Sequence, residues 1–204
     1  YWLMKSEPDE CSIDDLAAAP PSHQRLRTDD PFSPFPEEIN RRLATQLTTL
    51  HLAATPTSCE NLVRDGVARD NIVVTGNTVI DALHWAVDRK PAYDNADLER
   101  IDESTDRVLL VTAHRRESWG EPMRNIGHAL ADLADRYPSL QIVFPIHRNP
   151  LVRDAIIPSV AGKANVTVIE PLAYGAFSRL MARADVVLTD SGGVQEETTA
   201  LGVP

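Results

Sequence analysis

The sequence has little of what marks secreted, zinc-binding or membrane-spanning proteins. Only two of its 204 residues are cysteines, Cys11 and Cys59, and neither has a second cysteine or a histidine at metal-ligand spacing. A disulfide framework and a zinc site are therefore not expected, and a reducing compartment is favoured. No run of 18 or more apolar residues is present, and the first residues lack the pattern of a signal peptide. The sequence therefore predicts a cytoplasmic protein.

A concentrated basic surface is also missing. The chain has 20 Lys and Arg against 30 Asp and Glu, which gives a formal net charge of -10, and the basic residues are scattered. Nucleic-acid binding requires a concentrated cationic surface, so this composition argues against nucleic acid as the main partner. A small anionic ligand, which needs only a few well-placed donors, remains open.

The first half of the chain carries a mixed pattern. Residues 1–36 are rich in proline and show little apolar periodicity. The spacing of apolar residues then predicts a helix over residues 39–50. Beyond it we expect a helix opened by the capping-box residues Thr57–Glu60 and ended by Gly66, a strand over 72–75, a helix over 79–90 and a loop over 91–106.

From residue 107 the pattern becomes regular. Short apolar runs, as expected of strands buried on both faces, alternate with helical periodicity. Strands are predicted over 108–112, 141–144, 166–169 and 185–189, and helices over 126–137, 150–157, 177–184 and 194–201. Four successive βα units indicate an α/β fold with a Rossmann-like, doubly wound parallel sheet, because parallel strands need crossover connections.

Ligands of such sheets bind beyond the carboxyl ends of the strands. That rule gathers His114, Arg115, His147 and the chain's only Gly-Gly pair, in Ser191–Gly193, at one edge. Glycines between a strand and a helix suit a phosphate or diphosphate, because backbone N–H groups point at it there. A tight turn, and histidines in a solvated charged loop, are the structural alternatives. For the carboxylates at Glu37 and Glu38, simple charges at a helix start are the stronger interpretation.

Six motifs occur in order, and together they resemble the signatures of the non-hydrolysing UDP-N-acetylglucosamine 2-epimerases over about residues 25–204. They are Leu26-Arg-Thr-Asp, Ser33-Pro-Phe-Pro-Glu-Glu-Ile-Asn-Arg41, Thr75-Gly-Asn-Thr-Val-Ile-Asp-Ala82, Thr112-Ala-His-Arg-Arg-Glu-Ser118, Pro145-Ile-His-Arg-Asn-Pro150 and Thr189-Asp-Ser-Gly-Gly-Val-Gln-Glu-Glu197. Six motifs in order are far more specific than any one of them.

The resemblance implies a glycosyltransferase-B-type architecture of two Rossmann-like domains, usually as a homodimer, and here incomplete at both ends. On this basis residues 23–76 would end the first domain, and 77–204 would form most of a second, UDP-binding domain. Residues 1–22 instead resemble the start of EVE (PUA-like) domains, which read modified bases. They are too few to form an independent domain.

The activity implied by the resemblance is interconversion of UDP-GlcNAc and UDP-ManNAc at C2, through elimination and re-addition of UDP, without a metal or nicotinamide cofactor. By motif position Glu37 and His114 would be catalytic. Further positions would contact UDP or form an allosteric UDP-GlcNAc site. The UDP contacts would be His114, Phe177, Ser191, Gly192, Gly193 and Glu197, and the allosteric residues Arg115 and His147. A UDP-sugar glycosyltransferase, a hydrolysing 2-epimerase and an EVE-type nucleic-acid module are the alternatives.

One departure from the family pattern affects a catalytic position. The pattern His-x-Glu-Ala-Gly before Leu-Arg-Thr is replaced by Ser22-His-Gln-Arg25, so that His23 holds the place of a second catalytic glutamate. Upstream groups of the first domain, including a further catalytic aspartate, have no counterpart in this sequence.

We therefore predict that this chain alone has little or no epimerase activity, since groups that the reaction needs are missing from it. The measurement is conversion of UDP-GlcNAc to UDP-ManNAc by the purified chain. Turnover near the rate of a full-length family member would contradict the prediction.

Overall fold

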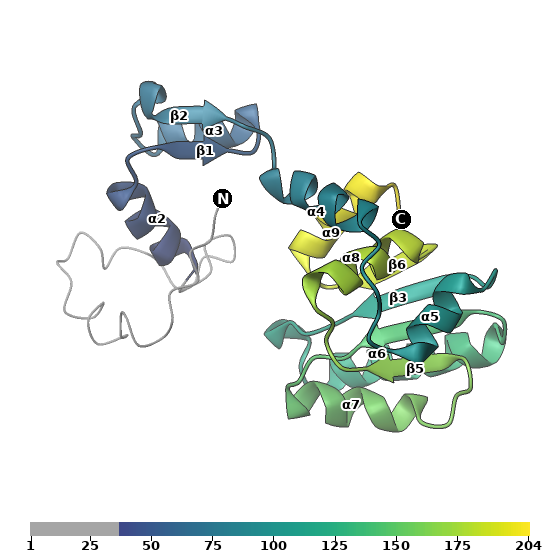
Figure 1. Ribbon diagram of the computed structural model, residues 1–204. Helices are drawn as coiled ribbons and strands as arrows, with labels where there is room; N and C mark the ends of the chain where they lie inside the picture. The colour runs from purple at the N-terminus through teal and green to yellow at the C-terminus, as the bar shows by residue number, and fades with distance from the viewer. Residues whose placement is uncertain (1–36) are drawn as a thin grey trace. The chain divides into compact units, whose positions relative to one another are not determined.

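The computed structural model describes residues 37–204, which divide into two compact units at Thr78–Val79 (Figure 1). The EVE-like start, the Ser22–Arg25 departure and the motif at Leu26 lie outside the described residues, as does the beginning of the motif at Ser33. The predicted assignment of the domains, with its boundary at residues 76–77, stays a prediction.

The first unit is a small parallel βαβ arrangement preceded by a helix. Its elements are α2 (Glu37–Leu47), β1 (His51–Ala53), α3 (Pro56–Arg64), the 3₁₀ turn Arg69–Asn71 and β2 (Ile72–Val74). Strands β1 and β2 pair in parallel, with His51 opposite Ile72. Helix α3 is the crossover between them, and its apolar face closes a small core of Ala53, Cys59, Leu62 and Ile72.

Three predictions for this unit were wrong in detail. The helix predicted to reach residue 50 ends at Leu47, whose side chain is 85% exposed, so the apolar spacing beyond it is not a buried stripe. Strand β1 was not predicted. Helix α3 is capped by Thr55, whose Oγ1 accepts from the Ser58 N–H, instead of by Thr57, because Pro56 already takes the first helical position.

The second unit has the predicted Rossmann-like topology. Its helices are α4 (Thr78–Asp88), α5 (Ala96–Glu103), α6 (Glu121–Arg136), α7 (Pro150–Val160), α8 (Tyr174–Arg183) and α9 (Gly192–Leu201). Its strands are β3 (Val108–Thr112), β4 (Gln141–Pro145), β5 (Val166–Ile169) and β6 (Val186–Thr189). They form one parallel sheet in the order β5-β4-β3-β6, which confirms the doubly wound α/β prediction (Figure 1).

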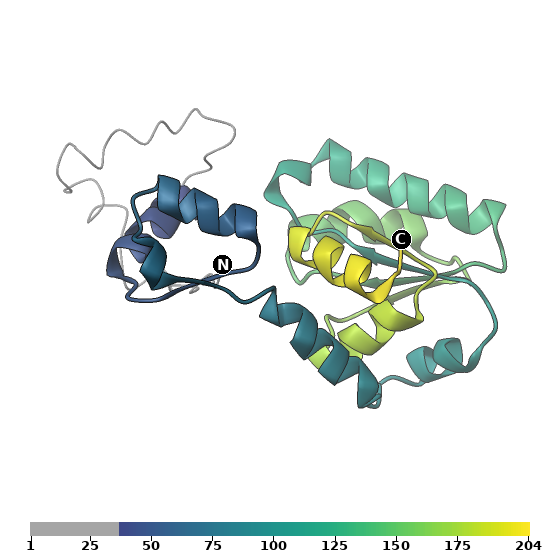
Figure 2. The ribbon, with the colours of Figure 1, turned by 90° about the horizontal axis from the view of Figure 1, so that it is seen from above.

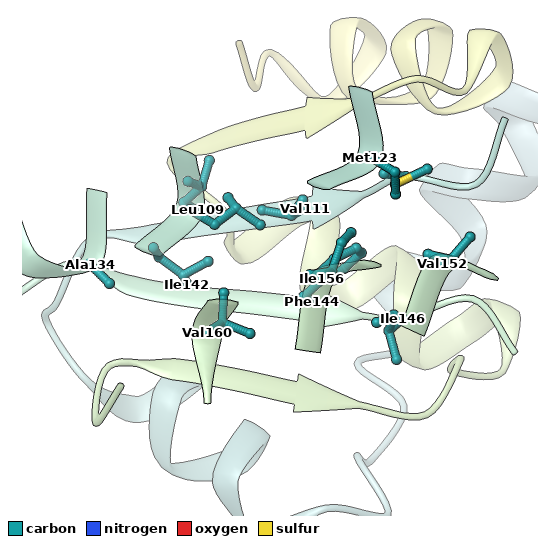
Figure 3. Packing of buried hydrophobic residues seen from close by; sticks show 12 residues of the cluster. Leu109, Val111, Met123, Ala134, Ile142, Phe144, Ile146, Val152, Ile156 and Val160 are labelled. Carbon is teal, nitrogen blue, oxygen red and sulfur yellow. The ribbon is translucent and has the colours of Figure 1, made fainter. Parts of the chain in front are cut away.

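Helices cover both faces of this sheet, as Figure 2 shows. Successive residues of a strand point to opposite faces, so Leu109 and Val111 pack on one side of β3, and Val108 and Leu110 on the other. The first side is closed by α6 and α7, whose apolar side chains meet those of β3 and β4 in Figure 3. The second is closed by α4, α5 and α8, with α9 packed against them. None of the helices between residues 37 and 204 is long and apolar enough to cross a membrane.

The segment predicted as a loop over residues 91–106 contains a helix, α5, so this prediction was wrong. Asn95 caps the helix by accepting from the backbone N–H groups of Asp97 and Leu98. Leu98 and Ile101 are completely buried. Two apolar residues within an acidic run are too weak a periodic signal, and tertiary packing decides the conformation here. Ion pairs from Arg179 on α8 to Glu99 (3.1 Å) and Asp102 (2.6 Å) attach α5 to α8.

Helices α6 and α7 approach closely at Gly127. A Cβ atom at this position would lie 3.2 Å from the Cα atom of Ile156 and 3.3 Å from the carbonyl oxygen of Ala155. Both atoms belong to the α7 backbone, which would have to shift by a few tenths of an ångström to admit even one methyl group. Gly127 thus sets the separation of the two helices that cover one face of the sheet.

We predict that Gly127→Val lowers the free energy of unfolding by about 1–3 kcal/mol, because the added methyl groups overpack the α6–α7 contact. Urea denaturation measures the change. Ala129→Val is the matched control, since Ala129 lies in the same helix and is exposed. It includes the intrinsic cost of a β-branched residue in a helix without the clash. Equal losses in both variants would contradict the prediction.

Candidate functional site

The strand order creates a switch point between β3 and β6. The chain moves outward from β3 to β4 and β5, then returns to place β6 on the opposite side of β3. Ligands of open α/β sheets bind at such a point, outside the carboxyl ends of the strands. Thr112 and Thr189 are partners in the register, so both strands end level. Their hydroxyl oxygens lie 2.6 Å apart, and Oγ1 of Thr189 also accepts from the Ser191 N–H at 3.0 Å.

Asp190 joins the loop after β3 to the end of β6. Its carboxylate accepts from the backbone N–H groups of His114 and Arg115, each at 2.9 Å to Oδ2. Oδ1 lies 3.2 Å from Nδ1 of the His114 imidazole. Asp190 was not among the site residues predicted from the sequence. Its position directly after a buried strand, within Thr-Asp-Ser-Gly-Gly, was the available signal.

The two predicted histidines lie together. The imidazole rings of His114 and His147 are stacked, with centroids 5.9 Å apart and an interplanar angle of 23°. Nδ1 of His147 accepts from the Asn149 N–H at 3.1 Å. The His147 carbonyl oxygen accepts from Nε of Arg153 at 3.2 Å. The structure therefore brings the ends of β3 and β4 into one cluster.

The amino-terminal end of α9 is suited to an anion. Ser191 is the N-cap residue without a side-chain capping bond, and Gly192 and Gly193 open the helix with no acidic residue in its first turn. Nothing lies within 4 Å of a Cβ atom built on Gly193, so its backbone faces open space. A Cβ atom on Gly192 would lie 3.8 Å from Nη2 of Arg115. The helix dipole and a guanidinium thus act at the same place.

Glu197 and Phe177 are more buried than ligand-binding groups on an open surface would be. Glu197 is 9% exposed, and the Tyr174 hydroxyl lies 3.5 Å from its Oε1. Burial raises the pKa of Glu197; the hydrogen bond from Tyr174 opposes this rise, and the charge of Glu196 adds to it. Phe177, in the first turn of α8, is half-buried and packs against the core on the α8 face of the sheet.

One predicted catalytic residue belongs to the other unit. Glu37 is the first residue of α2, in the other unit, and its backbone alone is described. The remaining predicted positions all belong to residues 79–204. Among residues 37–204, no group of three or more His, Cys, Asp or Glu is placed to hold a metal ion.

Comparisons with known proteins agree on one family. The family model described as UDP-N-acetylglucosamine 2-epimerase matches residues 25–204. The Escherichia coli K12 protein named UDP-N-acetylglucosamine 2-epimerase is 45% identical over 185 residues, covering 88% of this chain and 49% of its own length. The chain spans about half the length of the curated relatives it matches.

Solved structures give the same result. The Neisseria meningitidis UDP-GlcNAc 2-epimerase bound to UDP-GlcNAc matches with a TM-score of 0.73 and 40% identity, covering 88% of this chain and 49% of that one. The Staphylococcus aureus MnaA–UDP structure matches with a TM-score of 0.76 and 39% identity, covering 88% and 48%.

We predict that Glu197→Gln stabilises the chain at neutral pH, because the buried carboxylate no longer has to ionise. A carboxyl group whose pKa is raised on folding contributes stability that is lost as the pH rises through its folded pKa. The gain in Tm should therefore be present at pH 7.5 and absent below about pH 4, near the pKa of an unperturbed glutamate.

Thermal unfolding at the two pH values is the measurement. Glu103→Gln is the control, since Glu103 is exposed on α5. An equal rise in Tm for both variants, or a rise that does not depend on pH, would count against a burial effect at Glu197.

Proposed function

The chain belongs to the UDP-N-acetylglucosamine 2-epimerase family, and from this membership we propose that it binds a UDP-sugar at the carboxyl ends of β3 and β6. The reaction proposed for the whole enzyme is interconversion of UDP-GlcNAc and UDP-ManNAc. The observation that carries the proposal is the convergence of the α9 amino terminus, the Arg115 guanidinium and the His114 imidazole at one switch point. A diphosphate matches all three, because the helix terminus offers N–H donors, the guanidinium offers a positive charge, and the imidazole offers a donor once it is protonated.

Each predicted residue has a place in this proposal. Ser191, Gly192 and Gly193 would bind the diphosphate through backbone N–H groups, since the open space at Gly193 lets a phosphate approach the helix. Glu197 would accept hydrogen bonds from the ribose hydroxyls, and Phe177 would form part of the uracil pocket. Arg115 and His147 are proposed for the allosteric UDP-GlcNAc site. That site would adjoin the diphosphate site, since the His147 ring stacks on His114 and the Arg115 guanidinium also lies beside Gly192 at the start of α9.

The proposed chemistry breaks and reforms two bonds. A base removes the C2 proton while the bond between C1 and the UDP oxygen breaks, and the electron pair of that bond leaves with UDP. A double bond between C1 and C2 remains. UDP then adds back to C1, and a proton adds to the opposite face of C2. Glu37 and His114 are the acid–base groups proposed for this chain, and stabilisation of the departing diphosphate falls to the α9 site.

The alternative functions have weaker support. The relatives described above carry the epimerase name, which favours epimerisation over a glycosyltransferase or a hydrolysing 2-epimerase. The net charge of -10 speaks against an EVE-type nucleic-acid module. We also propose that the protein is cytoplasmic and forms a homodimer. The family resemblance supports the homodimer, and the free, buried thiol of Cys59 supports a reducing compartment.

Binding of UDP to the purified chain tests the site directly. We predict that Gly193→Ala weakens UDP binding by about tenfold or more, because a methyl group would occupy the space that the phosphate needs. The same change should leave Tm unchanged or raise it, since alanine favours a helix over glycine by roughly 0.5–1 kcal/mol and the folded chain has room for the methyl group.

Isothermal titration calorimetry with UDP, UMP and uridine is the measurement, with thermal unfolding in parallel. Thr199→Ala is the control, since Thr199 is exposed and lies in the second half of the same helix. UDP affinity that Gly193→Ala leaves unchanged would argue against the α9 amino terminus as the diphosphate site. So would equal affinity for uridine and UDP.

A further inference from the structure

The carboxylate of Asp190 lies beside Nδ1 of His114. The Oδ1 atom lies 3.2 Å from Nδ1 of His114, and the Asp190 side chain is only 19% exposed. A carboxylate can only accept hydrogen bonds, so the contact is favourable when Nδ1 is the donor. In the neutral ring the lone pair then lies on Nε2. Two backbone N–H groups at 2.9 Å hold the carboxylate in place.

His147 has the opposite arrangement. Its Nδ1 accepts from the Asn149 N–H at 3.1 Å, so the lone pair lies on Nδ1 and the proton of the neutral ring on Nε2. The two rings are stacked 5.9 Å apart at the same edge of the sheet. The cluster therefore combines one imidazole whose Nε2 accepts with a neighbour whose Nε2 donates.

We propose that Asp190 is a positioning residue that keeps His114 in the tautomer with Nδ1 protonated, so that Nε2 is the atom that gains and releases a proton. Once Nε2 is protonated, Asp190 is the counter-charge of the imidazolium. The protonated ring then donates a hydrogen bond to the phosphate oxygen that receives the electron pair of the breaking C1–O bond. This inference rests on the proposed function and names the group that controls His114 within the site.

A second aspartate separates this role from simple strand pairing. Asp185 lies at the other end of β6, where its Oδ2 accepts from the Val108 N–H at the start of β3, at 2.9 Å. Its charged neighbours are Arg183 at 3.6 Å and Arg107 at 3.9 Å. Both aspartates thus connect β6 with β3 through a backbone N–H, but of the two only Asp190 is paired with an imidazole. Asp185→Asn is therefore a matched control.

The experiment uses the whole chain with ¹⁵N-labelled histidine, at a pH where the imidazoles are neutral, with His114→Gln to assign the signals. Long-range ¹H–¹⁵N spectra should show Nδ1 of His114 protonated in the wild type. In Asp190→Asn the amide group can donate to Nδ1, so the population should move to the tautomer protonated at Nε2. Asp185→Asn should leave it unchanged. UDP affinity should fall about tenfold or more in Asp190→Asn, because the imidazolium that donates to the phosphate loses its counter-charge, and change less than about twofold in Asp185→Asn.

The wild-type spectrum alone can overturn the proposal: His114 protonated at Nε2 would do so even if Asp190→Asn fails to fold. An Asp190→Asn variant that keeps the Nδ1 proton would also overturn it. Equal losses of UDP affinity in the two aspartate variants would mean that Asp190 only connects β6 with β3, and this would also contradict the proposal. If the wild-type chain does not bind UDP but the tautomer changes as described, the proposed function fails and the positioning role of Asp190 stands.

Discussion

The parallel pairing of β3 with β6 is the constraint on which the second unit depends. Because Leu109 pairs with Val186 and Thr112 with Thr189, the two strands end at the same level. Neighbouring strands lie about 4.8 Å apart, so the segments that follow them lie side by side at one edge of the sheet. The hydrogen bond between the hydroxyl groups of Thr112 and Thr189 keeps the two strand ends level. The Asp190 carboxylate accepts from the backbone N–H of His114 and so holds the loop after β3 next to the end of β6. A shift of this register would separate the His114 imidazole from the amino terminus of α9.

The sheet could be predicted from the sequence because its two inner strands, β3 and β4, are buried on both faces. Residues 108–111 and 142–144 have no exposed side chain, and short continuous apolar runs of this kind are typical of the inner strands of a parallel sheet. Elements with few buried side chains leave only a weak apolar pattern in the sequence. Strand β1 has three residues, of which Ala53 is the only buried one. Helix α5 is held by two buried side chains and by Arg179, which comes from a helix some 80 residues away in the sequence. Contacts of this range leave no local pattern.

The location of the site could also be predicted, but its internal chemistry could not. Parallel strands deliver their carboxyl ends to one edge, so the clustering of His114, His147 and the Gly-Gly pair follows from topology. The tautomers of the two histidines depend on which backbone or carboxylate atom each Nδ1 meets, and loop geometry determines that. The burial of Glu197 could not be predicted either, since a glutamate in a polar stretch of sequence is expected to be exposed.

The order of the strands along the chain also bears on how the protein is made. The candidate site lies between the first and the last strand of its sheet, and 76 residues separate His114 from the carboxylate beside it. During translation β3 is synthesised before β6, so the two strands cannot pair until the residues between them have been made. The entropic cost of closing that long loop is offset only when β6 pairs with β3. A nascent chain interrupted before α9 could bury much of its apolar surface between β3, β4 and β5. It would nevertheless lack the amino terminus of α9, at which we propose that UDP binds, so UDP binding would require that α9 has been synthesised.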